Sequence, residues 1–382
     1  MSPMLLDYET LKIIWWLLIG VLLIGFALTD GFDMGVGALL PFIGRNDDER
    51  RVIIASIKPT WEGNQVWLVT AGAAIFAAWP LVYAAAFYSF YAAMLLILFA
   101  LFMRPLGIES RSKIPDPRWR SAWDWALFAG GAVPATVFGV AFGNLLQGVP
   151  FQFDSTMRIT YTGTFLALLN PFALLCGLVS LGMLVMHGAA FLRVKTTGEV
   201  QRRANHALRW SALGTLACFV IGGFWVAAGI DGYRIIAMPA GASAANPLLK
   251  QVESGAGLWL VNYTSYPWTM LAPAVGIGAA AVAAWLATSP RTVPAFVATG
   301  CSVTGIILTA GLSMFPFLMP SSSHPASSLT AWDAVSSHHT LMIMLVAIVV
   351  CLPVVIAYTG WVYRVVRGKV TAQSVRDGEH LY

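Results

Sequence analysis

The chain has 382 residues, of which 58% are hydrophobic and only 11% are charged. Soluble globular proteins average about 25% charged residues, so this composition excludes a soluble enzyme, a disordered chain, a collagen-like chain and a nucleic-acid-binding domain. The formal net charge of +5 is better explained by basic loops on one side of a membrane. We therefore expect an all-α multi-pass membrane protein, with residues 1–382 forming a single integral membrane domain surrounded by lipids.

The apolar runs predict nine membrane-spanning helices, since each crossing needs about 20 apolar residues. In chain order they cover residues 11–33, 52–77, 80–104, 121–146, 163–191, 206–228, 262–288, 292–318 and 338–367. Residues 66–103 carry no charge and are too many for one helix, so Pro80 is expected to break them. The second span is polar in its first half, and that half is expected to face the inside of the helix bundle.

Lysine and arginine alternate between rich and poor connections along the chain. The connections after the first, third and fifth spans and the C-terminal tail are basic, whereas those after the second, fourth, sixth and eighth spans are poor in these residues. By the positive-inside rule, the N-terminus is expected on the periplasmic side and the C-terminus in the cytoplasm. The seventh connection fits this rule weakly, with Arg291 alone. Asp7 and Glu9 precede the first apolar run, where a signal peptide would need positive charge, so we expect that run to be retained.

Two carboxylates at the end of the first span are the most informative feature. Asp30 and Asp33 are three residues apart, so they share one face of a helix. They lie near the predicted cytoplasmic end of the span, where they could simply end the helix at the level of the lipid headgroups. Alternatively, they form an uptake point for protons or cations, because acidic residues at membrane depth are usually functional.

The segment from Lys58 to Trp67 is expected to bring a third carboxylate to the same side of the membrane. Glu62 lies a turn or two inside the second span, next to Trp61. Lys58 precedes Glu62 by four residues, so the two could pair on one helix face. The alternative is that Glu62 joins Asp30 and Asp33 in a polar path, where desolvated carboxylates take up and release protons near neutral pH.

Other residues that could carry chemistry are few. Arg104, at the end of the third span, either snorkels to the cytoplasmic interface or neutralises the carboxylate cluster. His187 is the one histidine well inside a span and is expected to be a hydrogen-bonded core residue, so two or more bis-histidine haems cannot be held by this chain alone. The four cysteines lie far apart, without the spacing of a zinc or redox motif, and no metal site is expected.

A series of motifs follows the whole chain in order. They are Trp15-Trp16 with Gly31–Gly35, Arg45–Arg51, Trp61–Trp67, Phe76–Pro80, Phe102–Pro105, Gly143–Pro150, Gly229–Tyr233, Phe315–Ser322, Ser328–Asp333 and the C-terminal Leu381-Tyr382. Together they resemble subunit II of the cytochrome bd-type quinol oxidases, the family that includes the cyanide-insensitive oxidases. Each motif alone is weak, but their combination in this order is highly specific.

The resemblance implies a heterodimer in the bacterial inner membrane. Each of its two similar subunits would have nine helices, arranged as two four-helix bundles and one peripheral helix. Subunit I would carry two b-type haems, haem d and the quinol oxidation site. This chain would then hold no cofactor, apart from the structural quinone found in some members. A small single-span accessory subunit is a further implied partner. The complex would oxidise two quinols from the quinone pool and reduce one dioxygen to two waters.

Residue by residue, the resemblance implies a proton path from the cytoplasm through Asp30, Asp33 and Glu62, supported by Trp61, Arg104 and Lys58. Many relatives have Asp where this chain has Glu62, so its reach is longer by one methylene and its hydrogen-bond partners cannot be copied from them. Two other hypotheses remain open. An ion-coupled secondary transporter would have broken helices around a midplane site and an inverted repeat, and a haem-free scaffold would only stabilise subunit I.

Overall fold

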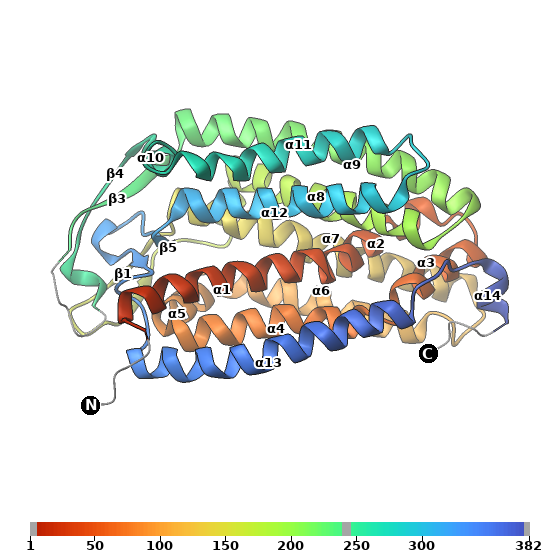
Figure 1. The fold of residues 1–382 in the computed structure, drawn as a ribbon, viewed down its shortest axis with the longest axis horizontal. Helices are drawn as coiled ribbons and strands as arrows, with labels where there is room; N and C mark the ends of the chain where they lie inside the picture. The colour runs from red at the N-terminus through yellow and green to blue at the C-terminus, as the bar shows by residue number, and fades with distance from the viewer. Residues whose placement is uncertain (1–5, 239–245, 378–382) are drawn as a thin grey trace.

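The computed structural model describes residues 6–238 and 246–377, so the Leu381-Tyr382 motif lies outside the described residues. Long helices that run along one axis make up most of the molecule (Figure 1). They are α1 (Tyr8–Leu28), α2 (Asp30–Ile43), α3 (Asp47–Ile57), α4 (Trp61–Ala78), α5 (Pro80–Ser89), α6 (Tyr91–Ser110), α7 (Pro117–Gln147), α8 (Pro171–Lys195), α9 (Gly198–Gly229), α10 (Val261–Ser265), α11 (Leu271–Leu286), α12 (Thr292–Met314), α13 (His338–Val365) and α14 (Ala372–Arg376). Three antiparallel hairpins pair β1 (Phe151–Phe153) with β2 (Ile159–Tyr161), β3 (Asp231–Ala237) with β4 (Gln251–Ala256), and β5 (Phe317–Met319) with β6 (Leu329–Thr330).

Eight helices of the described chain are long and apolar enough to cross a membrane, and the count reaches nine when the bent pair α4–α5 is taken as one span. The first crossing, α1 with α2, continues to Ile43, so the expected end near residue 33 is wrong. The expected break at Pro80 is confirmed, because proline has no N–H with which to continue α4. The expected span 80–104 is wrong in its first half, since α5 turns by 119° from α4 and α6 begins only at Tyr91.

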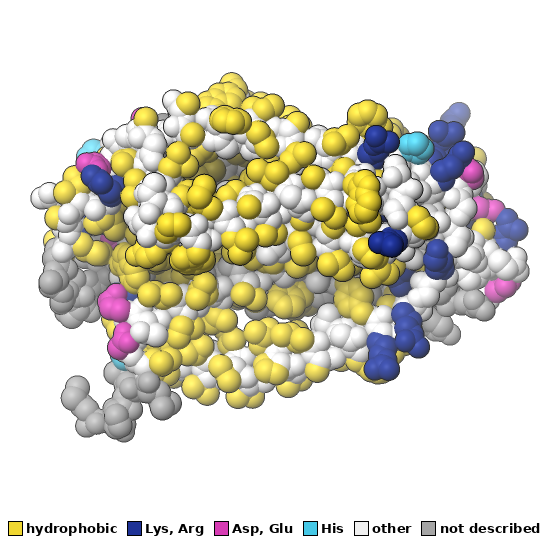
Figure 2. All heavy atoms as spheres, turned by 45° about the horizontal axis from the view of Figure 1, so that its top comes forward, with side chains coloured by type: hydrophobic (Ala, Val, Ile, Leu, Met, Phe, Trp, Pro, Cys, Tyr) yellow, Lys and Arg dark blue, Asp and Glu magenta, His cyan; other side chains and the backbone are white. Residues whose placement is uncertain are grey.

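The two ends of the molecule differ in structure and charge. The three hairpins gather at one end, on the left of Figure 1, which we call the hairpin end. The other end holds α3 and α14, and Lys and Arg side chains gather there beyond a broad hydrophobic band (Figure 2), so we call it the basic end. This distribution of charge is the one that the alternation of basic connections predicts.

Helices α2 and α8 cross at a pair of glycines, which lets their backbones come very close. A Cβ atom on Gly35 of α2 would lie 2.0 Å from the carbonyl oxygen of Leu184 in α8, and a Cβ atom on Gly188 of α8 would lie 2.6 Å from the carbonyl carbon of Gly35. Buried residues of both helices belong to one apolar cluster. Such close contact provides dispersion energy that lipid chains cannot match, which is how membrane helices associate.

Helix α13 packs very differently. Leu341 is its one buried residue, although the helix has 28 residues. Side chains such as Val346, Val350 and Val354 are more than half exposed. The helix lies beside α1 and α4 (Figure 1), so its outer face must be covered by lipid or by another protein.

A buried ion pair fastens two loops of the hairpin end. The Lys250 ammonium lies 2.8 Å from Asp333 Oδ2, and the two side chains are 1% and 4% exposed. Lys250 also donates to the carbonyl oxygens of Pro247 and Ala326, while Asp333 Oδ1 accepts hydrogen bonds from the backbone N–H and the hydroxyl of Thr330. The pair therefore ties the segment after β3 to the loop that leads into α13.

A second charged network closes the basic end. Asp124 of α7 is buried and accepts hydrogen bonds from Arg111 at 2.5 and 3.2 Å and from Arg50 at 2.6 Å. Arg111 also lies 2.9 Å from Asp47, the first residue of α3. Partial burial alone would raise the pKa of the Asp47 carboxyl, but its arginine partners outweigh this effect and the pKa is lowered. The network fixes α3 and the loop after α6 against α7.

Candidate proton-transfer site

A short interruption of the first crossing positions its two carboxylates. The hydroxyl and the backbone N–H of Thr29 both donate to the carbonyl oxygen of Gly25, at 2.7 and 3.0 Å, and Thr29 is the single residue between α1 and α2. Asp30 and Asp33 therefore lie in the first turn of a new helix, α2, where negative charge is favoured by the helix dipole. Both side chains are fully enclosed, with exposures of 0% and 1%.

Asp30 is held by an arginine from α6. Arg104 donates from its two terminal nitrogen atoms to the two carboxylate oxygens, at 2.9 and 2.5 Å. Arg104 is buried, so it acts as a counter-charge and does not snorkel to the interface. The pair links α2 to α6, and its bidentate geometry is the strongest form of such a contact.

Asp33 has no comparable partner. Asn64 of α4 donates from Nδ2 to Asp33 Oδ2 at 2.7 Å, and the Tyr363 hydroxyl of α13 donates to Asn64 Oδ1 at 2.7 Å. The other carboxylate oxygen of Asp33, Oδ1, is buried and has no hydrogen-bond partner among the described residues. Sequence reasoning missed Tyr363, because a tyrosine near the end of a span ordinarily indicates an interface anchor.

Glu62 does not join this pair. It is the second residue of α4 and its side chain is exposed, whereas Asn64, two residues later, is buried against Asp33. Two residues turn a helix by about 200°, so Glu62 and Asn64 lie on nearly opposite sides of α4. The expectation that the polar start of the second span faces the interior is therefore right for Asn64 and wrong for Glu62.

Lys58 and Trp61 are the two other residues that were expected to support the path. Lys58 lies 3.2 Å from Glu109 of α6, so the alternative pairing of Lys58 with Glu62 is wrong. Trp61 is 7% exposed and belongs to the main apolar cluster. Thus the structure brings Asp30, Asp33 and Arg104 together in the interior and leaves Glu62 on the surface of this chain.

His187 is an ordinary core residue, as expected. Its Nδ1 atom lies 2.8 Å from the Thr299 hydroxyl, its Nε2 atom lies 3.1 Å from the carbonyl oxygen of Leu28, and its ring stacks on Phe296. Because both nitrogen atoms have partners, this side chain does not fit the role of a haem ligand. Within residues 6–238 and 246–377, no group of three His, Cys, Asp or Glu side chains could hold a metal ion.

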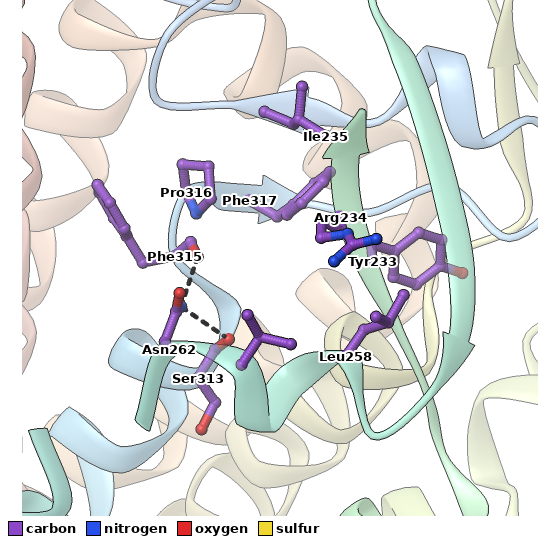
Figure 3. Close-up of a pocket in the computed structure, with 10 residues that line it drawn as sticks. Tyr233, Arg234, Ile235, Leu258, Asn262, Ser313, Phe315, Pro316 and Phe317 are labelled. Carbon is purple, nitrogen blue, oxygen red and sulfur yellow. Dashed lines mark hydrogen bonds between the residues drawn. The ribbon is translucent and has the colours of Figure 1, made fainter. Parts of the chain in front are cut away.

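A cavity of about 180 Å³ at the hairpin end lies between β3, α10 and the start of β5 (Figure 3). Its polar groups are already engaged. Asn262 donates to the carbonyl oxygens of Leu312 and Phe315, and Arg234 pairs with Glu253. Sites for organic ligands usually measure about 300–1,000 Å³, so these residues do not fit a whole quinone.

Comparisons with known proteins agree over nearly the whole chain. Residues 11–366 match the family described as cytochrome bd terminal oxidase subunit II. The chain is 52% identical to cytochrome bd-I ubiquinol oxidase subunit 2 of Escherichia coli (strain K12), over 98% of this chain and 99% of that protein. It is 51% identical to the probable cytochrome oxidase subunit 2 of Haemophilus influenzae, over the same shares, and 31% identical to cytochrome bd ubiquinol oxidase subunit 2 of Bacillus subtilis, over 94% and 96%.

The fold is also found among solved structures. A chain of the bd oxidase from Geobacillus thermodenitrificans matches with a TM-score of 0.66 at 16% identity, covering 93% of this chain and 98% of that one. At this identity the likeness concerns the fold alone. The sequence similarity is far stronger, and it shows that the chain belongs to the cytochrome bd terminal oxidase subunit II family, as a bacterial inner-membrane subunit of an oxygen-reducing quinol oxidase whose catalytic site is on the partner subunit.

Proposed function

We propose that this subunit conducts protons from the cytoplasm towards the oxygen-reducing site of subunit I, through the carboxyl groups of Asp30, Asp33 and Glu62. In this proposal the basic end faces the cytoplasm. Asp30 supplies the fixed charge that keeps Arg104 in place, whereas Asp33 and Glu62 exchange protons. The haems and the quinol oxidation site belong to subunit I. A structural quinone and a single-span accessory subunit remain part of the proposal, without a site assigned to them.

The observation that carries the proposal is the state of Asp33. One guanidinium, that of Arg104, neutralises one carboxylate, and it is bound to Asp30 on both oxygens. Asp33 accepts its one hydrogen bond among the described residues from an amide, and its other oxygen has no partner among them. A buried carboxylate without a counter-charge is costly, so a group with these surroundings is well suited to take up a proton and pass it on.

Glu62 supports the proposal because it requires a partner. The exposed residues of α4 recur at Glu62, Val66, Val69, Ala73 and Phe76, which is the spacing of one helix face. A glutamate that faced lipid on this side would be expensive, so we propose that subunit I covers this face of α4. Glu62 would then lie at the interface of the two subunits, where protons can cross from one chain to the other.

The experiment uses the intact complex of both subunits. We expect Asp33→Asn and Glu62→Gln each to slow oxygen consumption and proton uptake by about 10²-fold, the usual scale for losing a proton-transferring group, while the haem spectrum stays intact. Glu109→Gln serves as the matched control, because Glu109 is also an exposed carboxyl group near the basic end. Normal turnover with full haem content in both carboxyl variants would reject the proton path.

The scaffold hypothesis is the second candidate, and the Asp30–Arg104 pair favours it. This ion pair is fully enclosed and joins two helices, which is what an assembly role needs. If Asp33→Asn or Glu62→Gln lost the haems of subunit I, these residues would serve assembly and not proton transfer. Membership of the oxidase family removes the secondary transporter from the hypotheses.

A further inference from the structure

We propose that Asn64 and Tyr363 are positioning residues that hold one oxygen of Asp33, and that the other oxygen, Oδ1, is the one that exchanges protons. The inference rests on the proposed function and deepens it, since it assigns the two carboxylate oxygens different tasks. It also gives the last helix of the chain a part in the site.

Two hydrogen bonds connect Tyr363 to Asp33, and both are donated towards Asp33. Tyr363 donates its O–H to Asn64 Oδ1, and Asn64 donates its N–H to Asp33 Oδ2, both at 2.7 Å. The three groups come from α13, α4 and α2, so the contact depends on the packing of three separate helices. A carboxylate oxygen accepts in this arrangement, and the amide is fixed in the orientation that donates to it.

The amide of Asn64 is a poor relay for protons. A hydroxyl, a carboxyl group or a water molecule can accept one proton while it releases another, because the group that remains is the same as before. An amide would have to lose a proton from nitrogen while it gained one on oxygen, which leaves an unfavourable imidic acid. Asn64 therefore does not pass protons from Tyr363 to Asp33, and its task is to hold Oδ2 in place.

The second carboxylate oxygen of Asp33 has different surroundings. Asp33 Oδ1 is enclosed and has no hydrogen-bond partner among the described residues. The charged groups that face Asp33 are Asp30 on its own helix and Arg104 on α6, and Arg104 is already bound to both oxygens of Asp30. Oδ1 is therefore the atom at which the carboxylate can gain a proton from a water molecule to become a carboxyl group, and return that proton to a water molecule without breaking the contact with Asn64.

Helix α13 contributes to this site from its C-terminal end. This helix has one buried residue, Leu341, close to its start at the hairpin end. Tyr363 lies at the opposite end of the same helix, where its hydroxyl makes the hydrogen bond to Asn64. A change in the position of this part of α13 would therefore be transmitted to the orientation of Asp33.

The test compares Tyr363→Phe with Tyr358→Phe in the intact complex. Tyr358 lies on the same helix, is 64% exposed and makes no hydrogen bond among the described residues, so it is a matched control. Tyr363→Phe removes one hydroxyl, and we expect oxygen consumption to fall by about 2- to 10-fold, the scale of one lost hydrogen bond. Asn64→Leu is expected to cause at least as large a fall, and Tyr358→Phe to leave the rate unchanged.

A spectroscopic measurement separates positioning from a general loss of stability. The infrared difference spectrum between the oxidised and reduced complex contains carboxyl bands, and Asp33→Asn identifies the band of Asp33. We expect this band to shift in Tyr363→Phe and in Asn64→Leu, and to stay unchanged in Tyr358→Phe. An unmoved band together with wild-type turnover in Tyr363→Phe would overturn the inference.

The same data separate this inference from the proposed function. If Asp33→Asn and Glu62→Gln both turned over normally, the proton path would fail, yet a shifted Asp33 band in Tyr363→Phe would still support the positioning role. If Asp33→Asn slowed turnover while the band stayed unmoved in Tyr363→Phe and Asn64→Leu, the proton path would stand and the positioning role would be rejected.

Discussion

Helices α8 and α13 are both long and apolar, yet they occupy opposite kinds of environment. α13 is the more apolar of the two, but only Leu341 is buried within it. In α8, buried residues extend from Phe172 to Arg193 and include Gly177, Ser180 and Gly188. Hydrophobicity therefore does not indicate where the core of this protein lies. Small residues do, because lipid chains are as apolar as leucine and only close backbone contact favours protein over lipid.

The largest difference between α8 and α13 is expected when a glycine of each helix is replaced by leucine. Gly188→Leu in α8 would place side-chain atoms against the backbone of α2. Even a Cβ atom at this position would lie only 2.6 Å from the carbonyl carbon of Gly35. Because backbone cannot move aside as a side chain can, we expect the helices to separate and the assembled complex to be lost. A Cβ on Gly360 in α13 meets no atom within 4 Å, so Gly360→Leu is expected to have little effect on this subunit.

The measurement for both glycine variants is the yield of haem-containing complex from purified membranes. Equal loss in the two variants would contradict the view that α13 is loosely packed, and would show that another protein approaches Gly360 closely. Gly214→Leu in α9 is a further control, since a Cβ there also meets no atom within 4 Å.

A smaller effect is expected at the buried ion pair between α2 and α6. Arg104→Leu would leave Asp30 buried without its counter-charge, which costs about 3–5 kcal/mol. Combining Arg104→Leu with Asp30→Leu removes both charges, and we expect it to recover most of the thermal stability of the complex. A double variant as unstable as the single one would show that the guanidinium has further partners that matter.

The smallest effect concerns the buried ion pair of Lys250 with Asp333, which fastens the loop before α13 and which we call the clamp. Lys250→Met should destabilise the complex by about 1–3 kcal/mol, because Asp333 loses its cation but keeps two hydrogen bonds from Thr330. Lys250→Met with Asp333→Leu is expected to be close to wild type. Thermal unfolding of the purified complex measures both, and an undiminished stability of Lys250→Met would show that the clamp does not hold this loop.

The clamp also predicts a dependence on pH. Burial lowers the pKa of Lys250 below its ordinary value of 10.5, and Asp333 offsets part of this effect. Between the lowered pKa and 10.5, the unfolded chain binds one more proton than the folded chain. The cost of burying this lysine is therefore complete below that window and is relieved as the pH rises through it. The melting temperature of the wild type should rise relative to that of Lys250→Met over this range.

Much of the fold could be predicted from the sequence, because the length of apolar runs and the positions of basic connections follow directly from the membrane. The break at Pro80 follows from the chemistry of proline. The bend after α4 could not be predicted, because Pro80–Phe90 is as apolar as a spanning segment and only its packing against the hairpin strands distinguishes it.

The site was predictable in its residue types and only partly in its contacts. Asp30, Asp33 and Arg104 are charged side chains inside a membrane segment, where an unpaired charge is energetically costly. This cost alone predicts that they lie close together. Glu62 was expected inside the bundle, yet it faces outwards on this chain. We propose that subunit I covers it, and a surface that another subunit covers looks the same in sequence as a buried one. Tyr363 pairs with Asn64 across nearly the whole chain, and no local pattern indicates such a partner.

The thin packing of α13 has a consequence for biogenesis. Because so few of its residues are buried against its own subunit, we expect α13 to enter the bilayer as an almost independent single-span segment. Sliding or tilting of such a helix should cost little free energy, and membrane proteases should reach it easily. We therefore expect this subunit to be degraded quickly when it is made without subunit I. The lifetime of the subunit would then indicate whether it has assembled.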